Sequence, residues 1–418
     1  MKNICKLLVF ILVCVSLTMN AQEKEPKTGW NLGPLPAVGY NSDLGFQYGA
    51  LCAFFYYGDG SYFPDYKHKF HVEASQYTKG SGMYHFFYDS KYLIPSTRLT
   101  FAATYLPNKM MSFYGFNGFS SPYDNSKSPA FYAVDRKMLR ILADFQGEII
   151  DNVRWAAGLS FWNYNIGKVS LDKYKNETTL YDLYRQNGII KPEEANGGSQ
   201  IELKLGLVYD SRDHEAAPSE GIWAELVTYG SPDIIEKTDN AYLKLSAHFR
   251  QYIPIISDRL TFAYHLAYQG TIAGKTPFYV QQNITTLYLR QVNSEGLGGI
   301  NTIRGLLYNR IVADGFAWSN YELRLRLFDF NLLGQSWYFG INPFFDAGMA
   351  VNSYRLDEMK NANDTQIYNG DEEKIHYSAG LGAKVVMNRN FIVSIEFGKP
   401  FDSRDGDSGL NIGLNYIF

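Results

Sequence analysis

The stretch Asn320-Tyr321-Glu322-Leu323-Arg324-Leu325-Arg326-Leu327-Phe328 alternates polar and apolar side chains along its length. Because successive side chains of a β-strand point to opposite faces, this pattern predicts a strand with one apolar face and one charged face. Glu322, Arg324 and Arg326 would be costly against lipid, so the charged face is expected to line a wet lumen. The stretch therefore predicts a wall of a transmembrane β-barrel, with Glu322 and Arg324 in a lumenal charge network.

The end of the chain, Leu410-Asn411-Ile412-Gly413-Leu414-Asn415-Tyr416-Ile417-Phe418, repeats the pattern with an apolar residue at every even position. This period of two predicts a final strand that runs to Phe418 with its even-numbered side chains on one face. A last strand that ends on phenylalanine also resembles the C-terminal strand of outer-membrane barrels.

Dividing the chain by this pattern predicts about sixteen strands, an even number that suits a closed antiparallel barrel. The expected strands cover residues 31–40, 45–57, 67–78, 83–93, 97–106, 130–148, 153–169, 199–210, 220–230, 240–254, 258–272, 317–330, 337–350, 375–387, 390–399 and 409–418. Every second connection is short, and 107–129, 170–198, 273–316 and 351–374 are long, as expected of periplasmic turns and outer loops. The predicted fold class is all-β.

Residues 1–21 have the features of a secretory signal peptide: Lys2 and Lys6, an apolar run from Leu7 to Leu17, and the small residue Ala21. The expected organisation is a signal peptide at 1–21, a short periplasmic segment at 22–30 and an outer-membrane barrel at 31–418. The segment 22–30 is too short for a separate periplasmic domain. These features place the protein in the outer membrane of a Gram-negative bacterium.

The composition fits the same class of protein. Aromatic residues make up 16% of the chain, as expected of a barrel with aromatic girdles. Without the signal peptide Cys52 is the remaining cysteine, so no internal disulfide can form. Removal of Lys2 and Lys6 lowers the 39 basic residues to 37 against 42 acidic ones, and the resulting net charge of −5 gives no support to nucleic-acid binding.

An arginine stands among glycines in the long connection 273–316, within Gly298-Gly299-Ile300-Asn301-Thr302-Ile303-Arg304-Gly305-Leu306. Glycines allow positive φ and close approach, so this segment predicts a folded-back loop that aims the guanidinium of Arg304. The long connection 273–316 is expected to fold into the lumen. On the strand 337–350 the alternation places Asp346 inward. The two side chains are expected to form a bidentate, charge-assisted pair.

These motifs together resemble the BamA/TamA superfamily of outer-membrane proteins, also called the bacterial surface antigen family. The resemblance is carried by Ile303-Arg304-Gly305, Asn320-Tyr321-Glu322-Leu323-Arg324, Phe344-x-Asp346-x-Gly348, Tyr209-Asp210-Ser211-Arg212-Asp213 and Tyr377-Ser378-Ala379-Gly380-Leu381-Gly382. It covers most of the second half of the chain and is diffuse before about residue 199.

The resemblance implies a sixteen-stranded barrel in which the loop arginine pairs with the aspartate of the Phe-x-Asp-x-Gly strand. We call this contact the loop-to-barrel lock, formed by Arg304, Gly305, Asp346 and Gly348. The resemblance also implies insertion or translocation of proteins through a weakly paired seam between the first and last strands. The chain departs from the family in having Leu306 instead of an aromatic residue, and in lacking the periplasmic POTRA domains.

The seam is expected at Pro34, Pro36 and Phe418, because a proline cannot donate a hydrogen bond to a neighbouring strand. Asp210, Arg212 and Asp213 are expected to form a charged turn at the barrel rim.

No enzyme motif is found: the chain has no Gly-x-Ser-x-Gly elbow, no His-Glu-x-x-His pair and no cysteine set for zinc. We therefore expect no catalytic residue, no metal and no cofactor. The expected partners are outer-membrane lipid and other outer-membrane or assembly-machinery proteins. The leading hypothesis is a barrel without POTRA domains that assembles, inserts or translocates outer-membrane or surface proteins within a complex. A passive porin or scaffold barrel is the alternative.

Overall fold

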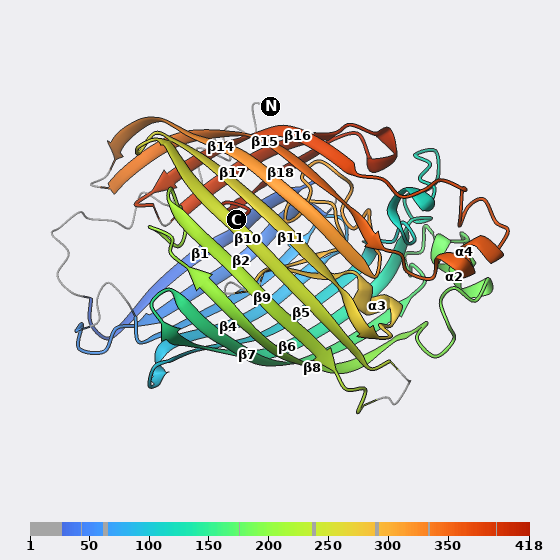
Figure 1. Ribbon diagram of the computed structural model, residues 1–418, viewed down its shortest axis with the longest axis horizontal. Coiled ribbons are helices and arrows are strands. Elements are labelled where there is room, and N and C mark those ends of the chain that lie inside the picture. Colours follow the sequence, from blue (N-terminus) through green and yellow to red (C-terminus); the bar gives the residue numbers. More distant parts are fainter. Residues whose placement is uncertain are drawn as a thin grey trace.

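The computed structural model describes residues 27–42, 44–61, 66–174, 176–235, 240–288, 292–332, 335–389 and 391–418. The expected signal peptide at 1–21 and residues 22–26 of the expected periplasmic segment lie outside this set. Sixteen antiparallel strands close into a single barrel, as the sequence predicts (Figure 1).

The strands follow one another around the barrel in chain order, apart from one short hairpin that is not in the wall. The wall strands are β1 (Trp30–Asn41), β2 (Gly45–Tyr56), β3 (His68–Tyr77), β4 (Gly82–Ile94), β5 (Thr97–Ser112), β6 (Ala133–Ile150), β7 (Val153–Gly167), β8 (Gly197–Asp210), β9 (Gly221–Ser231), β10 (Tyr242–Ile256), β11 (Leu260–Gly274), β14 (Gly315–Leu332), β15 (Gln335–Asn352), β16 (His376–Met387), β17 (Phe391–Pro400) and β18 (Gly409–Leu414).

Alternation along the strands separates an apolar outer wall from a polar lumen. On β14, Leu323 is 42% exposed, whereas its neighbours Glu322 and Arg324 are 1% and 6% exposed. On β8, Leu203 and Leu205 point outward and Lys204 is buried on the lumenal side. An outer face of exposed apolar side chains suits lipid, and the charged residues avoid it by facing inward. None of the helices in the described residues is long and apolar enough to span a membrane.

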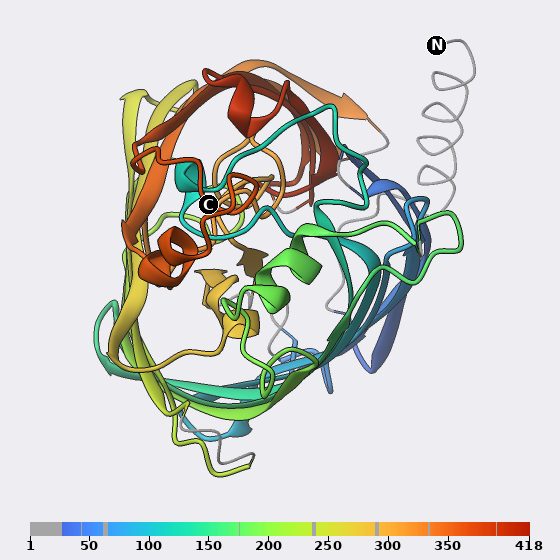
Figure 2. The same cartoon turned by 90° about the vertical axis from the view of Figure 1, so that its right-hand side faces the viewer.

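The connection between β11 and β14 lies inside the barrel instead of outside it. It carries α3 (Phe278–Gln281) and the hairpin of β12 (Asn283–Leu287) and β13 (Val292–Glu295). The view along the barrel shows these elements within the ring of strands (Figure 2). This connection, residues 275–314, is called the lumenal loop below.

The long connections gather at one end of the barrel and close it. They contribute α2 (Leu180–Gln186), α4 (Leu356–Asn361) and two single turns, η1 (Gly118–Ser120) and η2 (Ser403–Asp405). Their buried hydrophobic side chains, most of them aromatic, form one cluster with α3, which we call the cap; it includes Phe113, Phe116, Tyr181, Tyr184, Phe278, Tyr354 and Met359. Figure 2 shows these segments crossing the mouth of the barrel.

Most expected strand ends lie within three residues of the observed ones, and two differ by four residues or more. β5 continues past residue 106 to Ser112, where Met111 and Ser112 still pair with β6. The last strand was expected to reach Phe418 but ends at Leu414. Asn415 has a φ of 70°, in the left-handed region that asparagine tolerates better than most residues, and it turns the chain into the lumen.

Candidate functional site

Arg304 reaches the barrel wall because glycines let two backbones approach each other. Gly305 has a φ of +93°, and a Cβ added to it would lie 2.6 Å from the carbonyl carbon of Gly398 on β17. A Cβ on Gly348 would lie 2.7 Å from Cδ1 of Ile303. Larger residues at these positions would push the loop away from the wall.

The guanidinium of Arg304 is fully buried and holds Asp346 with two parallel hydrogen bonds. Nε donates to Oδ2 at 2.8 Å, and Nη2 donates to Oδ1 at 2.8 Å. The backbone N–H of Arg304 also donates to Asp346 Oδ2, at 2.9 Å. The contact expected from the sequence is therefore present, with the bidentate geometry that fixes direction as well as distance.

The remaining nitrogen of Arg304, Nη1, contacts two further carboxylates. It donates to Glu322 and lies 3.3 Å from Oε2 of Glu396 on β17. Lys384 on β16 pairs with Glu396, and Arg324 Nε donates to Glu322 Oε2 at 2.8 Å. Three cations thus balance three carboxylates, so no buried charge is left uncompensated.

Burial and charge act in opposite directions on this loop arginine. Burial lowers the pKa of Arg304, but Asp346, Glu396 and Glu322 raise it well above its ordinary value. The face of the guanidinium lies on the ring of Phe344, with Cζ 3.6 Å from the ring centre. The cation is therefore permanent, and a cation–π contact adds to its hydrogen bonds.

Glu396, Lys384 and Phe344 also belong to this network, although they were not predicted from the sequence as its members. A signal for Glu396 exists, because the alternation along Phe391–Pro400 places it on the lumenal face with Ser394. Phe344 shares the inward face of β15 with Asp346. Both side chains could have been assigned to the lumen by the reasoning applied to Asp346.

Arg310, also missed, connects the lumenal loop to the cap. Its Nη1 donates to the backbone oxygen of Gly118 at 3.1 Å, and its Nε donates to the backbone oxygen of Arg404 at 2.9 Å. The lumenal loop is thus attached to the barrel wall through Arg304 and to the cap through Arg310. Nothing in the spacing around Arg310 predicts its partners, which lie in loops distant in sequence.

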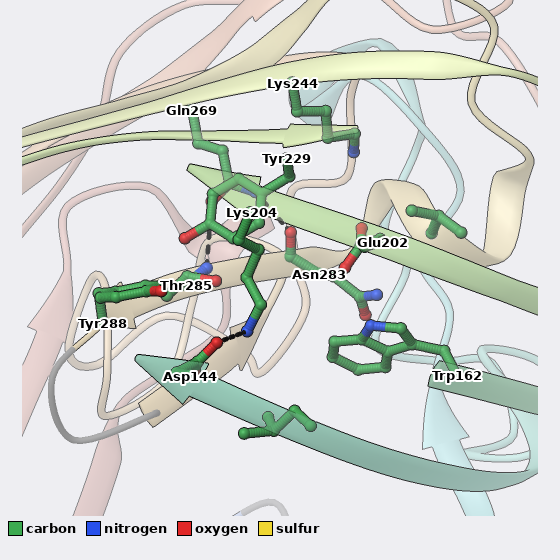
Figure 3. A pocket seen from close by; sticks show the side chains of 12 residues that line it. Asp144, Trp162, Glu202, Lys204, Tyr229, Lys244, Gln269, Asn283, Thr285 and Tyr288 are labelled. Atoms are coloured by element: carbon green, nitrogen blue, oxygen red, sulfur yellow. Dashed lines mark hydrogen bonds and ion pairs between the residues drawn. The ribbon is translucent and has the colours of Figure 1, made fainter. Parts of the chain in front are cut away.

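The hairpin of the lumenal loop covers a small polar cavity on the wall formed by β6, β8 and β9 (Figure 3). Its lining includes Asp144, Lys204, Tyr229 and Tyr288, and Lys204 Nζ lies 2.6 Å from Asp144 Oδ1. A volume of about 30 Å³ suits one or a few waters and no larger ligand. The described residues contain no group of acidic, histidine and cysteine side chains that could hold a metal ion.

Asp210, Arg212 and Asp213 lie together in a turn at the end of the barrel opposite the cap. Arg212 donates to both oxygens of Asp210 at 2.8 Å and stacks on Trp223, with Cζ 3.8 Å from the ring centre. Asp213 accepts from the backbone and hydroxyl of Ser219 at 2.8 and 2.7 Å. These contacts give the turn a fixed shape.

The seam between the first and last strands is short. β1 pairs with β18 through Tyr40 with Ile412 and Asn41 with Asn411, whereas it pairs with β2 along all of Trp30–Asn41. Pro34 and Pro36 therefore lie in the unpaired part of the β1 edge. A cavity of about 260 Å³ lies beside the seam, lined by residues that include Tyr40, Glu396, Asn411, Leu414 and Tyr416.

Phe418 is not at the seam, and its expected place there is wrong. The chain turns inward at Asn415, so Phe418 is 3% exposed and packs in the lumen with Trp223 and Tyr252. Arg324 Nη2 donates to the backbone oxygen of Phe418 at 2.8 Å. A period-two pattern shows which residues share a face of a strand, but it does not show where the strand ends.

The fold is similar to those of two proteins of known structure. One is BamA from Haemophilus ducreyi lacking POTRA domains 1-3, with a TM-score of 0.59 and 18% identity over 93% of this chain and 71% of the BamA chain. The other is CdiB from Escherichia coli, with a TM-score of 0.57 and 10% identity over 95% of this chain and 64% of the CdiB chain. This chain thus spans less than two thirds of CdiB, and at these identities the likeness concerns the fold alone.

No curated protein matches the chain. The Omp85 superfamily domain matches residues 68–418, which confirms the resemblance to BamA-like proteins. This protein therefore belongs to the Omp85 superfamily, whose non-enzymatic barrels lie in the outer membrane of Gram-negative bacteria.

Proposed function

We propose that this barrel assembles, inserts or translocates outer-membrane or surface proteins, and that it works in a complex with other outer-membrane or assembly proteins. The observation that carries the proposal is the short seam. Only Tyr40 and Asn41 of β1 pair with β18 among the described residues. Unpaired backbone groups are costly in lipid. The free edge of β1 would therefore bind a strand of another protein that supplies hydrogen-bond partners for its backbone.

Pro34 and Pro36 weaken the seam without weakening the rest of the wall. Just before β1, the N–H of Tyr57 donates to the oxygen of Gly29 at 2.9 Å. Since alternate residues of an antiparallel strand bond to opposite neighbours, odd-numbered residues of β1 face β2 and even-numbered ones face β18. The two prolines are even-numbered, so the donors they lack are those of the seam edge.

The loop-to-barrel lock supports the same proposal by keeping the lumen filled. Arg304 fixes the lumenal loop to β14, β15 and β17, and the cap covers the mouth at the end with the long loops. A barrel obstructed in this way is poorly suited to free diffusion of solutes. The passive porin hypothesis is therefore less well supported than a role in assembling, inserting or translocating proteins at the barrel wall.

Reconstitution tests the proposed function directly. The purified protein would be inserted into lipid vesicles, and an eight-stranded outer-membrane barrel unfolded in urea would be added as the probe. We expect the probe to fold faster than with empty vesicles, as measured by its resistance to unfolding in detergent at room temperature. Equal folding rates with empty vesicles, with this protein and with an ordinary porin would contradict an insertion role.

Purification of the tagged protein from its own outer membrane tests the expected complex. Assembly factors that remain bound after washing would support a role within a machine. Isolation of the barrel alone, under conditions that preserve other membrane complexes, would contradict that part of the proposal.

A further inference from the structure

His376, the first residue of β16, lies buried at the capped end of the barrel between two carboxylates. Its Nδ1 lies 2.7 Å from Oδ2 of Asp405, and its Nε2 lies 3.2 Å from Oε1 of Glu373. The side chains of His376 and Asp405 are both 0% exposed. An ionised carboxylate only accepts hydrogen bonds, so each ring nitrogen must donate one. Both nitrogens therefore carry a proton, and His376 is an imidazolium cation.

The cation lies where several connections between strands meet. Glu373, between β15 and β16, accepts from the backbone N–H of Phe119 at 2.8 Å. The ring of Phe119, between β5 and β6, stacks on the imidazole with ring centres 3.8 Å apart. Asp405 belongs to η2, between β17 and β18, and its backbone oxygen accepts from the N–H of Leu307 in the lumenal loop at 2.9 Å. His376 thus contacts each of these connections directly or through one partner.

Charge in this buried cluster balances only when His376 is protonated. Arg310 Nε lies 3.5 Å from Oδ1 of Asp405, so the two cations Arg310 and His376 face two carboxylates. A neutral imidazole keeps one N–H, and one carboxylate would then face a nitrogen lone pair. A net negative charge would also remain where little water can solvate it, which is unfavourable. A rise in pH that removes the proton therefore weakens the cluster, and a return to lower pH restores it.

The neighbouring surface charges do not replace this proton. Arg404 lies over the ring of Phe119, with Cζ 4.1 Å from the ring centre. It pairs with Asp402 at 2.7 Å and with Asp371 at 2.8 Å, and all three side chains are more than a third exposed. Asp402 also interacts electrostatically with His376. Exposed pairs are screened by solvent, so the charge of the buried cluster is set by His376 itself.

We propose that His376 is a pH-sensitive switch for the capped end of the barrel. In its charged form it holds the connection between β15 and β16 against η2, through Glu373 and Asp405. Loss of the proton frees one of these carboxylates, and the connections that cover the mouth then separate. The inference goes beyond the proposed function and does not depend on it, because it concerns the capped end and not the seam.

Proteolysis of the folded protein in detergent measures this separation. Between about pH 6 and pH 9 carboxylates stay charged and lysines and tyrosines keep their protons, so histidines and Cys52 are the side chains that titrate. In a Cys52→Ser background we expect proteinase K to cut the connections at the capped end several-fold faster at the alkaline limit than at the acidic one. Each rate is divided by that for an unstructured peptide at the same pH, which removes the pH dependence of the protease.

Three variants separate the switch from a purely structural role. His376→Gln has no charge to lose, so we expect fast cleavage across the whole range and a flat profile. Glu373→Gln removes one of the two carboxylates that favour the cation, so the transition should move to lower pH. His214→Gln is the matched control, because His214 lies in the turn between β8 and β9 at the opposite end of the barrel, and it should leave the profile unchanged.

A flat profile in the Cys52→Ser protein would overturn the proposal. So would a pH dependence that persists in His376→Gln, even if cleavage is faster, because a structural role alone gives that result. Electrophoretic mobility before and after heating verifies that each barrel is folded. An NMR titration of the histidine rings gives a result that does not require His376→Gln to fold: the signal moved by Glu373→Gln must come from a ring that is charged at neutral pH, and an uncharged ring would also overturn the proposal.

Discussion

The guanidinium of Arg304 lies among Asp346, Glu322 and Glu396, all of them nearly or fully buried. Removing one partner from a buried ion pair leaves the other charge uncompensated, which costs about 3–5 kcal/mol. The energetic importance of Arg304 therefore comes less from any single bond than from the carboxylates that depend on it. Its replacement is the strongest single-residue test of the lock.

Arg304→Ala should destabilise the barrel by about 3–5 kcal/mol. We expect a lower temperature of unfolding in detergent, measured by electrophoretic mobility after heating. Arg326→Ala is the control, since Arg326 pairs with Asp329 where both side chains are partly exposed and such pairs contribute about 0–1 kcal/mol. Equal unfolding temperatures for the two variants would show that the lock does not stabilise the fold.

Gly305→Ala should weaken the lock by a different route. A left-handed φ at a residue with a side chain costs on the order of 1–3 kcal/mol, and the new Cβ would also meet Gly398. Gly370→Ala separates the two effects, because Gly370 has a φ of +86° with nothing within 4 Å of the added Cβ. We expect Gly305→Ala to lower the unfolding temperature more than Gly370→Ala, and the reverse order would contradict the close-approach argument.

Among the elements, the cap depends on side chains from several loops. Phe116 is 1% exposed and contacts Tyr184 and Tyr354 edge to face, at centroid distances of 5.3 and 4.9 Å. Burial raises the pKa of Tyr184 to about 12, so its hydroxyl keeps its proton at neutral pH. The backbone oxygen of Tyr354 accepts from Asn117 Nδ2 at 2.9 Å, which joins the loop after β15 to the loop after β5.

Phe116→Ala should open the cap locally, because loss of a large buried ring costs about 3–5 kcal/mol. We expect faster trypsin cleavage at the cap in intact cells, with the barrel itself still folded. Phe401→Ala provides the comparison, since Phe401 is 69% exposed and should leave the cleavage rate unchanged. Equal rates for both variants and the unchanged protein would show that Phe116 does not hold the loops together.

The elements differ in how well the sequence predicts them. The strand β14 is predictable because the alternation of polar and apolar residues indicates which of its faces is lumenal. The same reasoning places Asp346 on the inner wall, where Arg304 can reach it. The end of β18 cannot be predicted in this way, because Asn415 fits the polar positions of the pattern although its backbone turns inward. The partners of Arg310 are equally hidden, since they are backbone oxygens of turns far away in the chain.

For the whole molecule, the lumenal loop and the cap determine what can pass through the barrel. In planar bilayers we expect small or flickering currents, because the lumen is filled by a loop attached at both Arg304 and Arg310. Arg304→Ala with Arg310→Ala should release both attachments and give larger, longer openings. A large, steady conductance in the unchanged protein would favour a passive porin.

The proposed function requires the wall to open between β1 and β18. In a Cys52→Ser background, Asn41→Cys with Asn411→Cys places a disulfide across the seam at a register pair, and Val38→Cys with Tyr48→Cys places one within the β1–β2 ladder. The decisive measurement is the folding rate of the urea-unfolded probe barrel in vesicles, before and after oxidation. We expect oxidation of the seam pair to abolish the acceleration, reduction to restore it, and oxidation of the ladder pair to have no effect. An unchanged rate after complete seam oxidation would contradict lateral opening of the wall.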